Sequence, residues 1–148
     1  MHYYDVTITS SGGEEIKLVT KTEQNENDAL ISGVKVAFDT LDDNVNQKSN
    51  AMLARIEVRG AITANNVEAL SKIVNWMKDF TPAAYRKVKI IVYEDISTIL
   101  RTYEIDEVFP RDYDEMYGSL EDDTHKGDPR FVLKMTQKQN KLQSIRIN

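Results

Sequence analysis

Cysteine is absent from this 148-residue chain, and histidine, proline and glycine are scarce, at two, three and six residues. Without cysteine there is no thiolate zinc ligand, no cysteine nucleophile and no redox pair. His2 and His125 leave few candidates for imidazole catalysis. The sequence also has no P-loop, GxGxxG, HExxH or GxSxG motif, so phosphate cradling, dinucleotide binding, zincin chemistry and a nucleophile elbow have no support. We therefore expect no catalytic residue, no cofactor and no metal ligand.

Long apolar runs are also missing. No uninterrupted stretch approaches the ~18 residues that a membrane-spanning helix needs. The residues after Met1 contain neither a basic region nor an apolar region of the kind found in secretory signals. These two absences predict a chain without a membrane segment that is cytoplasmic at synthesis. The length is that of one compact domain, so we expect a single domain over residues 1–148.

The charge is acidic overall and unevenly distributed. The net charge of −5 argues against general nucleic-acid binding. Residues 104–128 contain ten acidic and two basic side chains, a net of −8, whereas residues 129–148 contain five basic side chains and no acidic ones. One interpretation is that neighbouring strands pair these charges across a sheet within one chain. The other is that the two surfaces meet between copies of the protein, where charge complementarity steers assembly.

Apolar side chains alternate with polar ones along most of the chain, which is the pattern of half-buried strands. Ser11, Gly12 and Gly13 form a turn signal between the first two strands. The strand around Val88–Val92 is apolar on much of both faces, which predicts a central strand of the sheet. About eight strands are expected, and we predict a mainly β fold, an antiparallel sandwich or barrel. The apolar positions on which this depends are Tyr4–Ile8, Ile16–Leu18, Val34–Phe38, Met52–Val58, Val88–Val92, Ile99–Phe109, Phe131–Met135 and Ile145–Ile147.

One segment has helical periodicity instead. An apolar stripe recurs at helical spacing and predicts an amphipathic helix over 66–80, packed on the outside of the β structure. Asn65 followed by Glu68 predicts a capping box, and Pro82 ends the helix. Trp76 lies near the edge of the stripe, where it either closes the core or faces a neighbouring chain. The stripe consists of Val67, Leu70, Ile73, Val74 and Met77.

Two segments are expected to be loops: a long polar one at 39–51 and an acidic one at 118–128. Loops of this length in a compact domain are more often functional than accidental. Asp42, Asn44 and Asn46 begin like a calcium-binding loop, but Gln47 and Leu53 occupy the positions of its glycine and bidentate glutamate. His125 stands among acids (Asp122, Asp123 and Asp128), with no spacing typical of a metal motif.

The order of elements resembles the fold shared by phage tail tubes and the haemolysin-coregulated proteins of type VI secretion systems. That order is N-terminal strands, a long polar loop, a strand ending at Gly60, one helix, and long strands to the C-terminus. Four stretches are similar to small proteins encoded with phage-tail-like or contractile-injection genes, some labelled "membrane-associated protease". The stretches are 52–62 (MLARIEVRGAI), 85–93 (YRKVKIIVY), 101–117 (RTYEIDEVFPRDYDEMY) and 131–137 (FVLKMTQ).

The resemblance implies a structural subunit that works by self-assembly without catalysis. Such proteins form hexameric rings that stack into a tube inside a contractile sheath, with sheath and baseplate proteins as partners. It also implies release or delivery as part of a phage-tail-like particle, a helix on the outside, strand 99–109 as a candidate channel wall, and loop 39–51 reaching a neighbouring subunit. No nucleophile–base set and no zinc motif supports the protease label. The subunit-contact candidates are Asp42, Asp43, Lys48, Arg101, Glu104, Arg111, Lys134 and Lys138.

Three other functions remain open from the sequence. A baseplate or tube-end protein of the same machine would share the fold. A monomeric β-sandwich could instead use its acidic loops to bind a ligand, including calcium. A carboxylate-based hydrolase is the third alternative, because acidic pairs such as Asp112 and Asp114 are plentiful.

Overall fold

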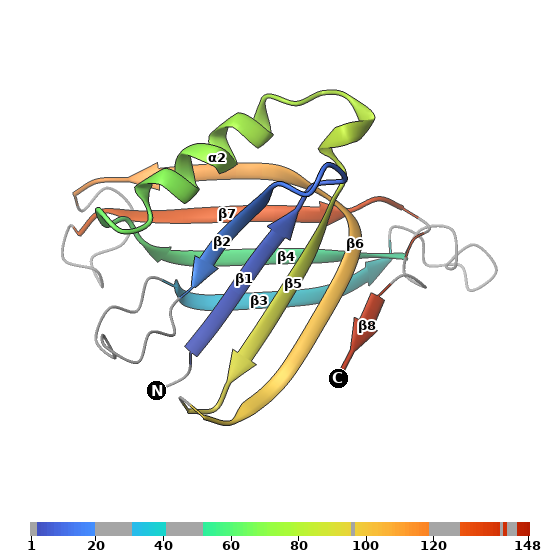
Figure 1. Ribbon diagram of the computed structural model, residues 1–148, viewed down its shortest axis with the longest axis horizontal. Coiled ribbons are helices and arrows are strands. Elements are labelled where there is room, and N and C mark those ends of the chain that lie inside the picture. Colours follow the sequence, from blue (N-terminus) through green and yellow to red (C-terminus); the bar gives the residue numbers. More distant parts are fainter. Residues whose placement is uncertain are drawn as a thin grey trace.

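A computed structural model describes residues 3–19, 31–40, 52–95, 97–118, 128–139, 141 and 145–148. The strands and helices in this part of the chain follow one another as expected from the alternating pattern (Figure 1). They are β1 (Tyr3–Thr9), β2 (Glu15–Val19), β3 (Ile31–Thr40), β4 (Met52–Ala61), helix α2 (Val67–Met77), the 3₁₀ turn η1 (Pro82–Ala84), β5 (Arg86–Tyr93), β6 (Ile99–Met116), β7 (Arg130–Gln137) and β8 (Ile145–Ile147).

All eight strands join one antiparallel sheet in the order β2-β1-β5-β6-β7-β4-β3, and β8 pairs with β6. β6 has 18 residues and belongs to two layers: its first half pairs with β5 and β8, and its second half pairs with β7. We call β2, β1, β5, β8 and residues 99–108 of β6 the first layer, and β3, β4, β7 and residues 109–116 of β6 the second layer. The strands of the two layers cross in Figure 1. The fold class expected from the sequence is thus confirmed, and among the described strands the sheet is curved but not closed into a barrel.

β6 turns from one layer to the other at Glu107. This residue has φ of 55°, which is uncommon for a residue with a side chain, and the register between β5 and β6 shifts beside it. Its main-chain oxygen accepts a hydrogen bond from the N–H of Lys138 at 2.8 Å. The bulge re-aims β6, so that one continuous strand builds both layers.

The hydrophobic core lies between the two layers. Val6 and Ile8 of β1 and Val88 and Ile90 of β5 belong to the same buried cluster as residues of β4 and β7 such as Ile56 and Leu133. Strand β5 lies between β1 and β6, which confirms the prediction that it is a central strand. Alternation along each strand sends every second side chain into this cluster, as the sequence pattern predicted.

Helix α2 packs against β2 and β6, and its buried residues are Leu70, Ile73 and Trp76. Trp76 is 1% exposed and donates a hydrogen bond from Nε1 to the main-chain oxygen of Ala84 at 2.7 Å, so it belongs to the core of this chain. Val67, expected on the apolar stripe, is 49% exposed. Val67 is the first residue of the helix and precedes the buried residues of the apolar stripe. Among the described residues, no helix combines the length and apolar character needed to cross a membrane.

The predicted capping box was wrong. The N-cap is Asn66, not Asn65, and its side chain makes no cap hydrogen bond. Its Oδ1 accepts the N–H of Thr63 at 2.9 Å, and its Nδ2 donates to the oxygen of Ala61 at 2.7 Å. The buried amide therefore fixes the turn that precedes the helix, which a sequence pattern centred on the helix cannot reveal.

Candidate functional site

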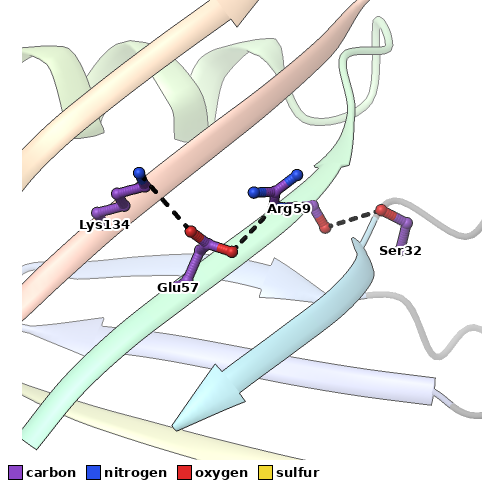
Figure 2. A network of polar contacts seen from close by, with 4 residues as sticks. All are labelled: Ser32, Glu57, Arg59 and Lys134. Atoms are coloured by element: carbon purple, nitrogen blue, oxygen red, sulfur yellow. Dashed lines mark hydrogen bonds and ion pairs between the residues drawn. The ribbon is translucent and has the colours of Figure 1, made fainter. Parts of the chain in front are cut away.

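The outer face of the second layer is charged and arranged around Glu57 of β4. Glu57 Oε2 accepts a hydrogen bond from Arg59 Nε at 2.9 Å, and its Oε1 lies 3.9 Å from Lys134 Nζ of β7 (Figure 2). Ser32 Oγ of β3 donates to the main-chain oxygen of Arg59 at 3.3 Å. These contacts tie the three strands together on their outward side. The face is hollowed by a depression of about 200 Å³ whose lining includes Lys35, Arg55, Glu57, Arg111 and Lys134.

The second layer has a free edge on each side among the described strands. β3 pairs only with β4, and residues 109–116 of β6 pair only with β7. An unpaired strand edge carries main-chain N–H and C=O groups that can accept another strand. The side chains of Lys35 on β3 and of Asp112 and Asp114 on β6 are exposed at these two edges.

The inward sides of the same edges carry aromatic residues. Phe38 of β3 is 47% exposed, an unusual state for a large apolar side chain at a core-facing position. On the opposite edge, Tyr113 packs against the core, its ring 6.3 Å from that of Phe131. Burial raises the pKa of Tyr113 well above its usual value, with Glu115 adding to the effect, so the phenol is neutral at physiological pH. Both edges therefore combine an apolar inner side with a charged outer side.

A second depression, of about 460 Å³, lies where β6 enters the second layer. Tyr85 and Phe109 pack edge to face there with their ring centres 5.7 Å apart, and the wall also includes Phe80, which is 95% exposed. The ammonium of Lys138 lies 5.2 Å from the centre of the Tyr85 ring. A neighbouring hollow contains Tyr85 and Phe109 together with Arg111 and Lys138. We call the two hollows together, with Phe80, Tyr85, Phe109, Arg111 and Lys138, the aromatic depression. It is apolar at its centre, carries Asp79 on the side of the first hollow, and is basic on the side of the second, at Arg111 and Lys138.

The structure brings some of the sequence-predicted contact residues together. Arg111 lines one hollow with Lys134 and another with Lys138. Glu104 lies on the first layer, 2.8 Å from Arg146 Nη2 and 3.9 Å from Lys89 Nζ, and Arg101 lies over the ring of Tyr103. Three of the candidates, Asp42, Asp43 and Lys48, lie outside the described residues, as do most of loops 39–51 and 118–128.

The acidic and basic segments pair within one chain at several points. This supports cross-strand pairing, the first of the two interpretations, for the residues concerned. The pairs are Glu104 with Arg146, Glu107 with Lys141 at 3.6 Å, and Asp112 opposite Lys134 in the ladder.

Sequence reasoning missed Lys35, Phe38, Phe80 and Tyr85. Alternation places Phe38 on the core side of β3 but does not tell that β3 is the last strand of the layer. The sequence gives a weak indication that Phe80 is exposed: it follows the apolar stripe of the helix and comes two residues before Pro82, so the helix offers it no packing surface. No residue of the described part belongs to a cluster of three or more potential metal ligands. Asp42, Asn44, Asn46, Asp122, Asp123 and His125, on which the calcium hypothesis depended, lie outside it.

No protein-family model matches this sequence, and no curated protein matches it. Solved structures do match over almost the whole chain. Hcp1 from E. coli EAEC 042 has a TM-score of 0.58 at 9% identity, covering 99% of this chain and 97% of its own. A chain of the extended sheath–tube complex of PVC, an extracellular contractile injection system, has a TM-score of 0.56 at 11% identity, covering 98% and 87%. A chain of the baseplate of the anti-feeding prophage (AFP) has a TM-score of 0.55 at 12% identity, covering 100% and 93%.

The chain therefore has the fold of the tail-tube class of β proteins. Within that class its solved neighbours are Hcp proteins and components of the PVC and AFP particles, which confirms, for the fold, the resemblance expected from the sequence. Identities this low show a shared fold, and function has to be argued from the surface of this chain.

Proposed function

We propose that this protein is a ring-forming structural subunit of the inner tube of a phage-tail-like contractile injection system, working by self-assembly without catalysis. The observation that carries the proposal is the pair of free edges on the second layer. The layer has four strands that alternate in direction, so its two edge strands, β3 and the second half of β6, run in opposite directions. A rotation about an axis along the strands preserves strand direction. Edge β3 of one copy would therefore meet the β6 edge of the next copy in antiparallel pairing.

Such a contact joins two different surfaces and can repeat around a closed ring. The resemblance implies six copies, whose second layers would form one continuous sheet around the channel. In this proposal the channel wall consists of β3, β4, β7 and residues 109–116 of β6. Strand 99–109, which the sequence suggested for the wall, lies mainly in the first layer.

The side chains at the two edges are complementary. Lys35 on the outer side of β3 would face the acidic Asp112 and Asp114 of the neighbouring copy. The half-exposed side chain of Phe38 would be buried against the inner side of the β6 edge of the neighbouring copy. Exposed strand edges left unpaired favour uncontrolled association, so a closed ring also removes a liability of this fold.

The first test is the oligomeric state of the wild-type chain, measured by light scattering on a sizing column with negative-stain images of the peak. Rings or short tubes are expected. Lys35→Glu should shift the protein toward monomer, as should Asp114→Lys, whereas the double variant should recover rings because the charges are exchanged rather than lost. Raising salt from about 0.05 to 0.5 M should weaken wild-type association, since exposed charges are then screened within a few ångströms.

Lys17→Glu is the matched control, because Lys17 is an exposed lysine on β2, in the first layer and on neither edge of the second layer. It should leave the ring intact. A wild-type chain that stays monomeric at every soluble concentration would contradict the proposal. So would ring formation unaffected by either single charge reversal, since the edges would then not be the contact.

A tube-end or baseplate position is the second candidate, favoured by the similarity to a chain of the AFP baseplate. The fold alone does not separate the two. A tube subunit should stack its rings without limit, whereas a tube-end protein should stop at one ring. Either role brings sheath or baseplate proteins as partners and release within the particle. Loop 39–51, with Asp42, Asp43 and Lys48, is proposed to reach the neighbouring subunit, and its deletion should leave a folded chain that no longer assembles.

A further inference from the structure

The hairpin between β5 and β6 ends in an exposed apolar tip. Ile99 and Leu100 are each 56% exposed, although they begin a strand. Glu94 and Asp95, both exposed, precede them, so the tip is acidic as well as apolar. We call residues 94–100, without the undescribed residue 96, the hairpin tip.

Hydrogen bonds hold the main chain at the described residues Glu94, Asp95, Ser97 and Thr98 of the hairpin tip. Asp95 Oδ1 accepts hydrogen bonds from the N–H of Ser97 at 2.9 Å and from the N–H of Thr98 at 2.8 Å. The N–H of Glu94 donates to the oxygen of Thr98 at 2.9 Å. The hydrogen bonds from Ser97 and Thr98 lower the pKa of Asp95, so its carboxylate stays charged at neutral pH. A tip ordered in advance loses little conformational entropy when it binds.

The aromatic depression has the complementary character. Its centre is formed by Tyr85, Phe109 and Phe80, and its rim carries Arg111 and Lys138. Among the described residues, Lys138 has no carboxylate within ion-pair distance, and its ammonium lies over the Tyr85 ring instead. An acidic tip with two exposed aliphatic side chains matches this surface in polarity, and matches it in charge on the side of Arg111 and Lys138, away from Asp79.

The tip and the depression cannot meet within one chain. η1 and Tyr85 precede β5 and the hairpin tip follows it, so the two surfaces lie at opposite ends of an eight-residue strand (Figure 1). At about 3.3 Å per residue, they are more than about 20 Å apart. The hairpin tip can therefore reach an aromatic depression only on another molecule.

We infer that the hairpin tip of one copy docks into the aromatic depression of a second copy of this chain. The contact is head to tail, because it joins opposite ends of β5, and it is therefore of the repeating kind that closes rings or extends tubes. This inference rests on the proposed assembly and adds to it a second contact, which uses the hairpin tip and lies beside the β6 edge at Phe109 and Arg111. Glu94 lies near Lys138 of the next copy, and Leu100 enters beside Phe80 and Phe109.

Cysteine cross-linking tests the contact directly, because the native chain has no cysteine. Leu100→Cys and Phe80→Cys are both exposed substitutions that should leave the fold intact. The chain with both cysteines should form a ladder of covalent oligomers on a non-reducing gel after mild oxidation. An equal mixture of the two single variants should stop at dimers. The matched control replaces Phe80→Cys by Ser71→Cys, an exposed position on α2, and should give no ladder.

Charge exchange provides the second measurement. Glu94→Lys alone and Lys138→Glu alone should each raise the concentration needed for assembly by about tenfold, and the double variant should restore it. If the wild-type chain forms rings but the double-cysteine chain gives no ladder and neither charge reversal weakens assembly, this contact is overturned while the strand-edge assembly stands. If the wild-type chain forms no oligomer at all, both the contact and the assembly are overturned. Rings that persist while a different protein is cross-linked to the depression would also overturn it.

Discussion

The side-chain amide of Gln137 donates a hydrogen bond of 3.2 Å to the main-chain oxygen of Asp106, at the corner where β6 leaves the first layer. The same amide nitrogen donates to the oxygen of Lys141 at 2.8 Å, and Oε1 accepts the N–H of Ala54 at 3.3 Å. Gln137 is fully buried, so it satisfies main-chain groups from three segments without water. One polar side chain in the core thus fixes the corner on which both layers depend.

Gln137→Leu should destabilise the fold strongly. The apolar side chain has a similar size but leaves three main-chain groups without their partner, the buried N–H of Ala54 and the partly buried oxygens of Asp106 and Lys141, at a cost of about 2–4 kcal/mol. Urea unfolding followed by the fluorescence of Trp76, the single tryptophan, measures the loss. Gln139→Leu is the control, since Gln139 is exposed two residues further on and should change the free energy of unfolding by less than about 0.5 kcal/mol. Equal stability of the two variants would mean that Gln137 does not hold the corner.

Trp76→Phe should cost about 2–3 kcal/mol. The substitution removes the 2.7 Å hydrogen bond to Ala84 and leaves the main-chain oxygen of Ala84 buried without this donor. It also leaves a space in place of the larger indole ring, over which Arg86 lies at 5.3 Å from the ring centre. Circular dichroism has to follow this unfolding because the variant has no tryptophan. Val67→Ala is the control: Val67 lies on the same helix but is half exposed, so its loss should be much smaller. A Trp76→Phe chain as stable as wild type would place the indole outside the core.

Stability should fall as the pH rises above about 10, the ordinary pKa of tyrosine. Burial raises the pKa of Tyr113, and burial together with Asp5, which accepts a hydrogen bond from Tyr93 Oη at 3.2 Å, raises the pKa of Tyr93. In this range the unfolded chain releases protons that the folded chain keeps, so each step in pH favours unfolding. Below about pH 9 both states hold these protons and the two groups add no pH dependence.

The measurement is the free energy of unfolding at a series of pH values between about 8.5 and 11, in the range where tyrosine titrates. Tyr113→Phe should flatten the decline, because its phenol is the more strongly shifted of the two. Tyr117→Phe is the comparison: Tyr117 is 58% exposed and its charge adds only a lesser contribution to the raised pKa of Tyr113, so the decline should flatten less than in Tyr113→Phe. A decline that is the same in Tyr113→Phe as in wild type would assign it to other groups.

Much of the fold followed from local pattern. Alternation between Tyr4 and Ile8, or between Val88 and Val92, requires a strand with one buried face at least, and the stripe from Leu70 to Met77 requires a helix. The longest strand was underestimated: the sequence placed its end near Phe109, whereas β6 continues to Met116. The second half of β6 lies at an edge of the sheet. Pro110 and the charged residues after it interrupt the apolar alternation there, so the sequence pattern did not reveal this part of the strand.

The candidate site was predicted less well. Arg111 and Lys138 were singled out from charge alone, and the structure brings them to one hollow. Phe38, Lys35 and Phe80 were not singled out. Their importance arises because no described strand lies beside Phe38 and Lys35 at the β3 edge, and because Phe80 is exposed rather than packed. A local sequence pattern indicates which face of a strand or helix a side chain lies on, but not whether another strand or side chain packs beside it.

The sequence by itself determined the elements, their order and their buried faces, since these depend on spacing over a few residues and on the removal of apolar side chains from water. It also excluded thiol chemistry, and it contains none of the common nucleotide-binding or zinc-binding motifs. Only the tertiary structure decided that β6 bends at Glu107 to serve two layers, that the second layer ends in two antiparallel edges, and that the hairpin tip and the aromatic depression lie at opposite ends of β5. These features depend on which strands become neighbours. That choice is made by packing between residues far apart in the chain, such as Ala54 and Gln137, which no local pattern contains.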